Sequence, residues 1–334
     1  FHRWSAQKLE EVLANELEAK LEFSSIEFNV FRGVELDSVR LITKGDTVLK
    51  ANSLQLYYEL EPLLIRRIVI REVLLDRADI RLLRNTHDST WNVAHIVKPK
   101  QDTTETKPFD WSIYIRDVAI QHSIVTVHDS LSGEPLPDRM HYTKMKLRDF
   151  NCSLSAALNI ARQDFFFCIN SMSFHEQRTN FTANDIHLCA EVDSTRLGIT
   201  AMRLITPTTN MFLRANIDSV NIFRSGAKIE EKPLTLEINS KALDAKDINW
   251  FMPSTFTLAN TFSLHTVCYG TLNNLLLEVD EVTTGSSNLH GTLELNHLTD
   301  DKTLAYTINL TPSKASYPDF RVALPTLQLP DINF

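Results

Sequence analysis

The stretch Leu234-Thr235-Leu236-Glu237-Ile238-Asn239 shows the pattern that decides the fold of this chain. Apolar and polar residues alternate along it, so a strand formed here carries one apolar and one polar face. The same alternation recurs at residues 54–60, 78–83, 213–217 and 293–295. Parallel strands buried on both faces would read as continuous apolar runs, so the alternation favours a mostly antiparallel sheet. We therefore expect an all-β dominated fold.

Helical periodicity is confined to a few segments. The clearest is residues 5–20, where apolar side chains recur at helical spacing at Leu9, Val12, Leu13 and Leu17. Its polar face is acidic, whereas helices lying on membranes favour Lys and Arg. We interpret residues 1–22 as an amphipathic helix that caps the sheet.

Two shorter helical segments interrupt the strands. Residues 91–97 predict a short helix, and residues 243–251 predict a helical turn. Asp244 is the expected N-cap of this turn, Asp247 stands where a capping box carries its acid, and Pro253 ends it. These helices are connections within a β protein.

The 334 residues allow one elongated β unit or about two ordinary domains. Residues 99–109 include the charged, Thr-rich sequence PKQDTTETKP and predict a flexible loop. We expect a first β segment over 23–98 and a continuing β-groove segment over 110–334, which together could form one continuous unit.

Many short strands with few helices are typical of a sandwich or a closed barrel. An elongated, curved sheet that folds into an open trough is the third alternative, and its inner face would be an apolar groove. Periodicity alone leaves these three folds open.

Composition excludes several functions. The net charge is −8, with no concentrated basic stripe, so we expect no nucleic-acid binding. Two segments are locally basic, and we interpret both as solvated strand faces: Arg66-Arg67 and Lys144/Lys146/Arg148. Only 8 glycines are present, and no G-x-G-x-x-G, Walker or G-x-S-x-G motif occurs.

The cysteines and histidines predict neither a metal site nor an enzyme. Cys152, Cys168, Cys189 and Cys268 form no C-x-x-C pair, and buried free thiols are favoured, with a Cys152–Cys168 disulfide as the alternative in an oxidising compartment. The pairs at 87–88 and 128–129 are His-Asp followed by Ser and are interpreted as turns. No H-E-x-x-H motif occurs, and we expect no cofactor.

No apolar run approaches the ~20 residues that span a bilayer, and no signal peptide is visible. The chain begins abruptly with Phe1-His2-Arg3-Trp4 before a helical pattern, so we expect a membrane anchor before residue 1 in the full-length protein. It ends on Asn333-Phe334, in a segment that reads as a strand about to continue.

Four stretches, taken in order, resemble the AsmA/TamB family, in its N-terminal periplasmic part. They are residues 38–41 with 51–56 and 63–70, residues 73–82 with 87–92, residues 173–176 with 204–209, and residues 239–248 with 270–275. The second stretch departs from the family pattern, because Ser89-Thr90-Trp91 stands where a Gly usually precedes the Asn region. The large C-terminal portion of TamB-like proteins has no counterpart here.

The resemblance implies a periplasmic body anchored to the inner membrane, with an apolar groove that shuttles phospholipid acyl chains between the inner and outer membranes. The alternative is a scaffold for outer-membrane proteins, which would act through strand addition to a membrane partner. Under the first reading, the groove would be lined by Leu54, Leu56, Ile68, Ile70, Ile80, Leu82, Ile113, Ile115, Leu213, Ile217, Leu234, Leu236, Ile238, Leu293 and Leu295.

Overall fold

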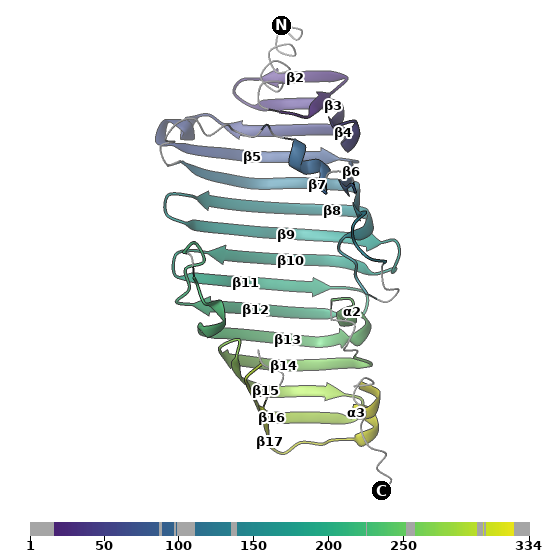
Figure 1. Cartoon of the computed structure of the whole chain (residues 1–334), viewed down its shortest axis with the longest axis vertical. Helices are drawn as coiled ribbons and strands as arrows, with labels where there is room; N and C mark the ends of the chain where they lie inside the picture. Colours follow the sequence, from purple (N-terminus) through teal and green to yellow (C-terminus); the bar gives the residue numbers. More distant parts are fainter. Residues whose placement is uncertain are drawn as a thin grey trace. The chain divides into compact units, whose positions relative to one another are not determined.

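The computed structural model describes residues 17–86, 89–96, 98, 111–134, 139–224, 226–251, 258–298, 303 and 305–323 (Figure 1). These residues are dominated by seventeen strands of mixed, largely antiparallel sheet, which confirms the β-dominated prediction. The first nine strands are β1 (Lys20–Glu22), β2 (Ser25–Asn29), β3 (Gly33–Thr43), β4 (Asp46–Glu59), β5 (Arg67–Asp76), β6 (Asp79–Arg84), β7 (Ser112–Asp129), β8 (Lys144–Asn159) and β9 (Asp164–Glu176). The others are β10 (Thr182–Val192), β11 (Arg196–Ile205), β12 (Asn210–Asp218), β13 (Leu234–Asp244), β14 (Thr261–Gly270), β15 (Asn274–Thr284), β16 (Ser287–Asn296) and β17 (Ala305–Leu310).

The chain divides into two compact units. The first comprises Phe1–Ala161 and Phe167–Thr182, and the second comprises Arg162–Phe166 and Ala183–Phe334. The predicted loop at 99–109 lies outside the described residues, so the expected division there stays a prediction.

The helical elements are short and lie between strands. They are η1 (Glu61–Ile65), η2 (Asn92–His95), η3 (Ile229–Glu231), α2 (Ala245–Asn249) and α3 (Tyr317–Ala323). The predicted helices at 91–97 and 243–251 are thus confirmed in shortened form. None of the described helices is long and apolar enough to cross a membrane.

The N-cap of α2 is the predicted one, because the Asp244 side chain accepts a hydrogen bond from the Lys246 N–H at 2.9 Å. Asp247 instead accepts hydrogen bonds from the hydroxyls of Thr206 and Thr208. The capping-box role predicted for Asp247 is therefore wrong, because its partners come from a strand connection about forty residues away.

The predicted N-terminal helix lies mostly outside the described residues. Where description begins, the chain is not helical, because Leu17 forms a bridge and Lys20–Glu22 is strand β1. The C-terminal boundary expected at residue 22 is therefore wrong. β1 pairs antiparallel with β3, with Leu21 opposite Leu41, so the last residues of the expected helix extend the sheet.

The first unit contains parallel pairs that alternation did not predict. β5 pairs in parallel with the first part of β7, and β6 pairs in parallel with its second part. β5 and β6 therefore follow one another along β7, and β8 pairs antiparallel with the other side of β7 (Figure 1).

A line of left-handed residues crosses this unit where β5 passes into β6. Ser38, Arg77, His122 and Asp149 all have φ between 49° and 52°. Leu36 and Val39 pack in one apolar cluster although they are three residues apart, and Leu75 and Ala78 do the same. A regular strand would place residues three apart on opposite faces, so each left-handed residue returns the apolar side chains to one face.

The second unit is a simpler arrangement. From β10 to β17 each strand pairs antiparallel with the next in sequence (Figure 1). At one end of these strands, Leu204, Met211 and Leu243 form a small buried cluster against which Ile248 of α2 packs. Among the described residues, the buried clusters named here are small, and most apolar strand side chains are only half-buried.

Candidate functional site

Three rows of apolar side chains cross the second unit from β10 to β17. Residues directly opposite one another in neighbouring strands point to the same face, so the strand register defines each row. The first row is Val192, Leu197, Ile217, Leu234, Gly270, Leu275, Leu295 and Tyr306. The second is Ala190, Ile199, Ala215, Leu236, Cys268, Leu277, Leu293 and Ile308. The third is Leu188, Met202, Leu213, Ile238, Thr266, Val279, Gly291 and Leu310.

These rows form one continuous apolar face, which we call the apolar face of the second unit. Only Thr266, Gly270 and Gly291 lack an apolar side chain there. The register shifts at Ile199/Met202 and Val279/Val282 are bulges that keep the rows aligned although the strict alternation breaks.

The opposite face of the same strands is polar. It carries the ion pair of Arg196 Nη1 with Glu191 Oε1 at 2.9 Å, and His265 Nδ1 lies 3.1 Å from Asp280 Oδ2. Glu237 lies on this face opposite Arg214. The two faces therefore differ sharply in chemistry.

The apolar face is not sealed by the residues that the structure describes. Cys268 is its only buried member; the others are half-buried, apart from Tyr306, Ile308 and Leu310 of β17, which are 69%, 56% and 57% exposed. In a sandwich, a second sheet would bury such side chains. A continuous, half-exposed apolar face is typical of a binding surface.

The first unit carries a comparable face. Its rows pass through β2, β3, β4, β5, β7 and β8, and the best aligned is Ile26, Leu36, Leu54, Leu75, Ile120 and Cys152. A parallel row is Phe28, Val34, Leu56, Val73, Val118 and Leu154. Beyond the left-handed residues, the rows continue as Leu49, Ile80, Val125 and Leu147, and as Leu82, Val127 and Met145. This unit buries more of its face, including Ile26, Leu36 and Leu75.

All of the lining residues predicted from the sequence lie on these rows or on their neighbours. In the first unit, Ile68 pairs with Ile113, and Ile70 pairs with Ile115. Every predicted lining residue is half-buried. Their contact with a lipid stays a prediction. The sequence reading missed row members beside bulges, among them Ile199, Val118 and Val279, because alternation breaks there.

Two free cysteines lie on the apolar faces. Cys152 and Cys268 are both buried and unpaired, as predicted. Burial raises the pKa of both thiols, so they behave as apolar side chains.

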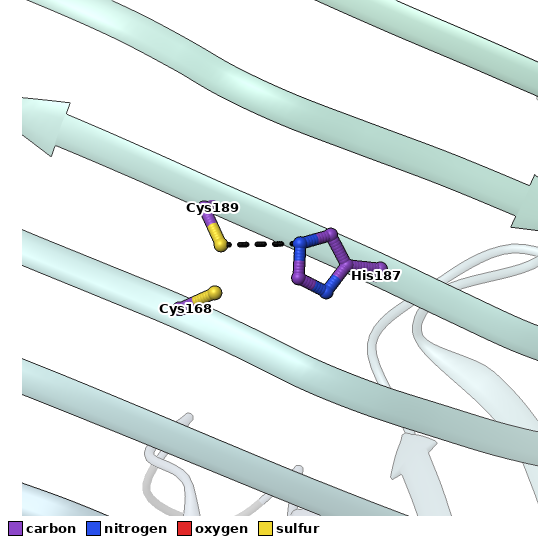
Figure 2. Close-up of side chains that lie close together, drawn as sticks. All are labelled: Cys168, His187 and Cys189. Atoms are coloured by element: carbon purple, nitrogen blue, oxygen red, sulfur yellow. Dashed lines mark hydrogen bonds between the residues drawn. The ribbon is translucent and has the colours of Figure 1, made fainter.

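The other two cysteines differ from the prediction of free thiols, because Cys168 of β9 and Cys189 of β10 are disulfide-bonded. Cys152 is therefore not the partner of Cys168. Figure 2 shows His187 beside this pair, with its Nε2 atom 3.3 Å from Cys189 Sγ. With both sulfurs bonded to each other, neither is a thiolate that binds a metal.

In the second His-Asp pair, the predicted turn role is confirmed for Asp129, whereas His128 pairs with Lys144 within the sheet. Asp129 Oδ1 accepts a hydrogen bond from the Leu131 N–H at 2.9 Å, and Arg84 pairs with Asp129 Oδ2 at 3.2 Å. His87 and Asp88 lie outside the described residues.

Comparison with known proteins found no family model that matches the chain and no similar protein among the curated ones.

Proposed function

We propose that the apolar face binds the acyl chains of phospholipids, as a groove module of the AsmA/TamB type. The observation that supports this most strongly is the continuity of the three half-buried apolar rows in the second unit. Each methylene that moves from water onto such a surface contributes about 0.8 kcal/mol when it is fully buried.

The dimensions of the face suit an acyl chain. Neighbouring strands lie about 4.8 Å apart, so a row across β10 to β17 extends about 34 Å. One leaflet of a bilayer core is about 15 Å thick. The face is therefore long enough for an acyl chain to lie across the strands and to pass from one strand to the next without leaving apolar surface.

In this proposal the protein is periplasmic, anchored to the inner membrane before residue 1, and moves phospholipid between the inner and outer membranes. The Cys168–Cys189 disulfide supports an oxidising compartment, because disulfides are rare where thiols are kept reduced. The sheet of each unit acts as an open groove and the chain performs no catalysis.

A mass spectrum of the organic extract from the purified chain tests the proposal. We expect phospholipid in an amount comparable with the protein. A folded chain that carries no lipid, and takes none up from phospholipid vesicles, would contradict it.

The edge of the second unit supports a second candidate function, a scaffold that recruits an outer-membrane protein by strand addition. Among the described residues β17 pairs only with β16, and all six of its residues are exposed. Its sequence, AYTINL, contains no charge and no proline, the features by which proteins usually protect a sheet edge.

The Asn309→Lys variant tests this second function, because a charge on the edge disfavours pairing with another strand and Asn309 lies off the apolar rows, opposite Thr292. We expect it to abolish a complex with the membrane partner while leaving bound lipid largely unchanged. A complex that survives the substitution would argue against strand addition at β17.

A further inference from the structure

Two neighbouring connections at one end of the first unit expose large apolar side chains to water. The turn between β2 and β3 carries Val30 and Phe31, which are 50% and 81% exposed. The connection between β4 and β5 carries Leu63, Leu64 and Ile65 of η1, which are 39%, 89% and 64% exposed. We call these five side chains the apolar tip. Single exposed apolar side chains are ordinary, but five on adjoining connections are typical of a binding surface.

Hydrogen bonds join the two connections. The Tyr58 N–H donates to the Arg32 carbonyl at 3.3 Å, and the Tyr58 hydroxyl donates to the Val30 carbonyl at 3.0 Å. Because η1 begins three residues after Tyr58, both connections lie at the same end of their strands, on the left in Figure 1. Within the turn, the Phe31 N–H donates to Asn29 Oδ1 at 2.9 Å. The backbone that carries the apolar tip is therefore held in place by hydrogen bonds.

Side chains that suit a membrane interface flank the apolar tip. Arg66 and Arg67 follow η1 directly, and both are exposed. Trp111 precedes β7 at the same end, because the Ser112 N–H donates to the Arg66 carbonyl at 3.1 Å. Arg67 Cζ lies 5.9 Å from the centre of the Tyr114 ring. Arginine, tryptophan and tyrosine are the residues that proteins place at the headgroup level, next to apolar side chains that enter the acyl region.

The charges near the apolar tip fit such a surface. Residues 60–67 contain one acid, Glu61, and the two arginines, so this connection has a net charge of +1. Glu59, just before it, is ion-paired with Arg116 at 2.8 Å. Further acids lie back along the strands, where they line a pocket together with two arginines: Glu27, Glu35, Glu72, Arg32 and Arg71.

The apolar tip lies next to the apolar face of the first unit. Phe28 of β2 begins the row that continues through Val34 and Leu56, and Val30 follows it by two residues. Two residues of strand span about 7 Å. Asn29, between them, pairs with Gly33 on the other face. An acyl chain that leaves a bilayer at the apolar tip is therefore close to this row.

We propose that the apolar tip inserts into the surface of a phospholipid bilayer and docks the first unit there, beside the lipids that the apolar face receives. What the contact delivers rests on the proposed function. The contact itself is a separate property, which depends on Phe31 and Leu64 most, because these are the most exposed members of the tip.

Cosedimentation of the whole chain with vesicles of phosphatidylglycerol and phosphatidylcholine tests the contact. We expect the parent to bind, and the double variant Phe31→Asp and Leu64→Asp to bind at least about tenfold more weakly, because carboxylates replace side chains that leave water. The melting temperature should stay that of the parent, since both side chains are exposed. Leu131→Asp is the matched control. Leu131 is 47% exposed and follows β7, at the opposite end of that strand from Trp111, so this variant should bind as the parent does.

Equal binding by the parent and the double variant would overturn the contact, as would an equal loss in Leu131→Asp. A parent that leaves protein-free vesicles unbound would also overturn it, in favour of a protein partner. The organic extract of the parent separates this result from the proposed function. Vesicle binding that is lost in the double variant, by a parent that carries no phospholipid, would support the contact and contradict the groove; bound phospholipid without vesicle binding would do the reverse.

Discussion

Replacing Leu236 and Ile238 of β13 with serine distinguishes an open apolar face from a sealed core. Both side chains lie on the apolar face of the second unit and are half-buried. Full burial of such a side chain contributes about 1.5–3 kcal/mol, so half-burial contributes about 1 kcal/mol for each. The double variant should therefore lose about 2 kcal/mol of the free energy of unfolding.

Thermal melting and denaturant unfolding measure this loss. One kcal/mol lowers Tm by about 2–4 °C in a unit of this size, so we expect the double variant to melt about 4–8 °C below the parent with its β-sheet intact. Bound phospholipid should fall strongly, because two unpaired hydroxyls interrupt adjacent rows and disfavour an acyl chain lying across them.

Glu237→Gln is the matched control, on the polar face of the same strand. Its carboxylate lies 3.9 Å from Arg214 Nη1 in an exposed pair, so the free energy of unfolding should change by no more than about 0.5 kcal/mol and bound lipid should stay the same. A loss of about 2–5 kcal/mol for each serine substitution, in a protein whose parent carries no lipid, would refute the open face.

Three further predictions concern stability. Replacing Cys168 and Cys189 with serine should cost about 3 kcal/mol for a loop of this length, measured as a lower Tm than that of the oxidised parent; equal melting would show that the bond adds no stability. Asp244→Ala should destabilise the second unit by about 1 kcal/mol in denaturant unfolding, because α2 loses its N-cap. Asp244→Asn should retain most of the stability, because asparagine is also a good N-cap. The hydrogen bond from Tyr57 to Glu35 raises the pKa of Tyr57 to about 12, so its contribution to stability should be complete below about pH 10 and lost as the pH rises through 12. Ultraviolet titration should show a tyrosine that ionises near pH 12 in the parent and none in Tyr57→Phe. A parent without such a tyrosine would contradict the assignment.

Alternation alone predicted the strands and the face to which their apolar residues belong. The stretch 234–239 is a strand with Leu234, Leu236 and Ile238 on one face, as its period of two indicates. That inference succeeds because side chains in a strand must alternate, whatever the surrounding fold. Whether a second layer covers the face depends on residues distant in sequence, which no local pattern contains.

Irregularities in the strands limited the prediction of strand register and pairing. The left-handed residues Ser38 and Arg77 shift the alternation by one position, and nothing in a serine or an arginine predicts a positive φ. The parallel pairing of β5 and β6 with β7 was also missed. β6 begins with the alternation of an antiparallel strand, although β5 carries the apolar runs 68–70 and 73–75 that are typical of parallel strands.

Side chains far apart in sequence were the hardest to predict. The Cys168–Cys189 disulfide depends on which strands carry the two thiols, and the spacing of the cysteines does not encode this. The sequence grouped Lys144, Lys146 and Arg148 as one solvated face. The structure confirms this for Lys146 and Arg148, which are exposed, but Lys144 is half-buried.

Photo-crosslinking in the cell is the most direct test of acyl-chain binding. A photoreactive amino acid at Leu236 lies on the apolar face, and the same group at Glu237 lies on the polar face of the same strand. We predict phospholipid adducts at position 236 and none at 237, detected by mass spectrometry of the purified protein. Adducts at both positions alike, or at neither, would contradict the claim that this face carries lipid.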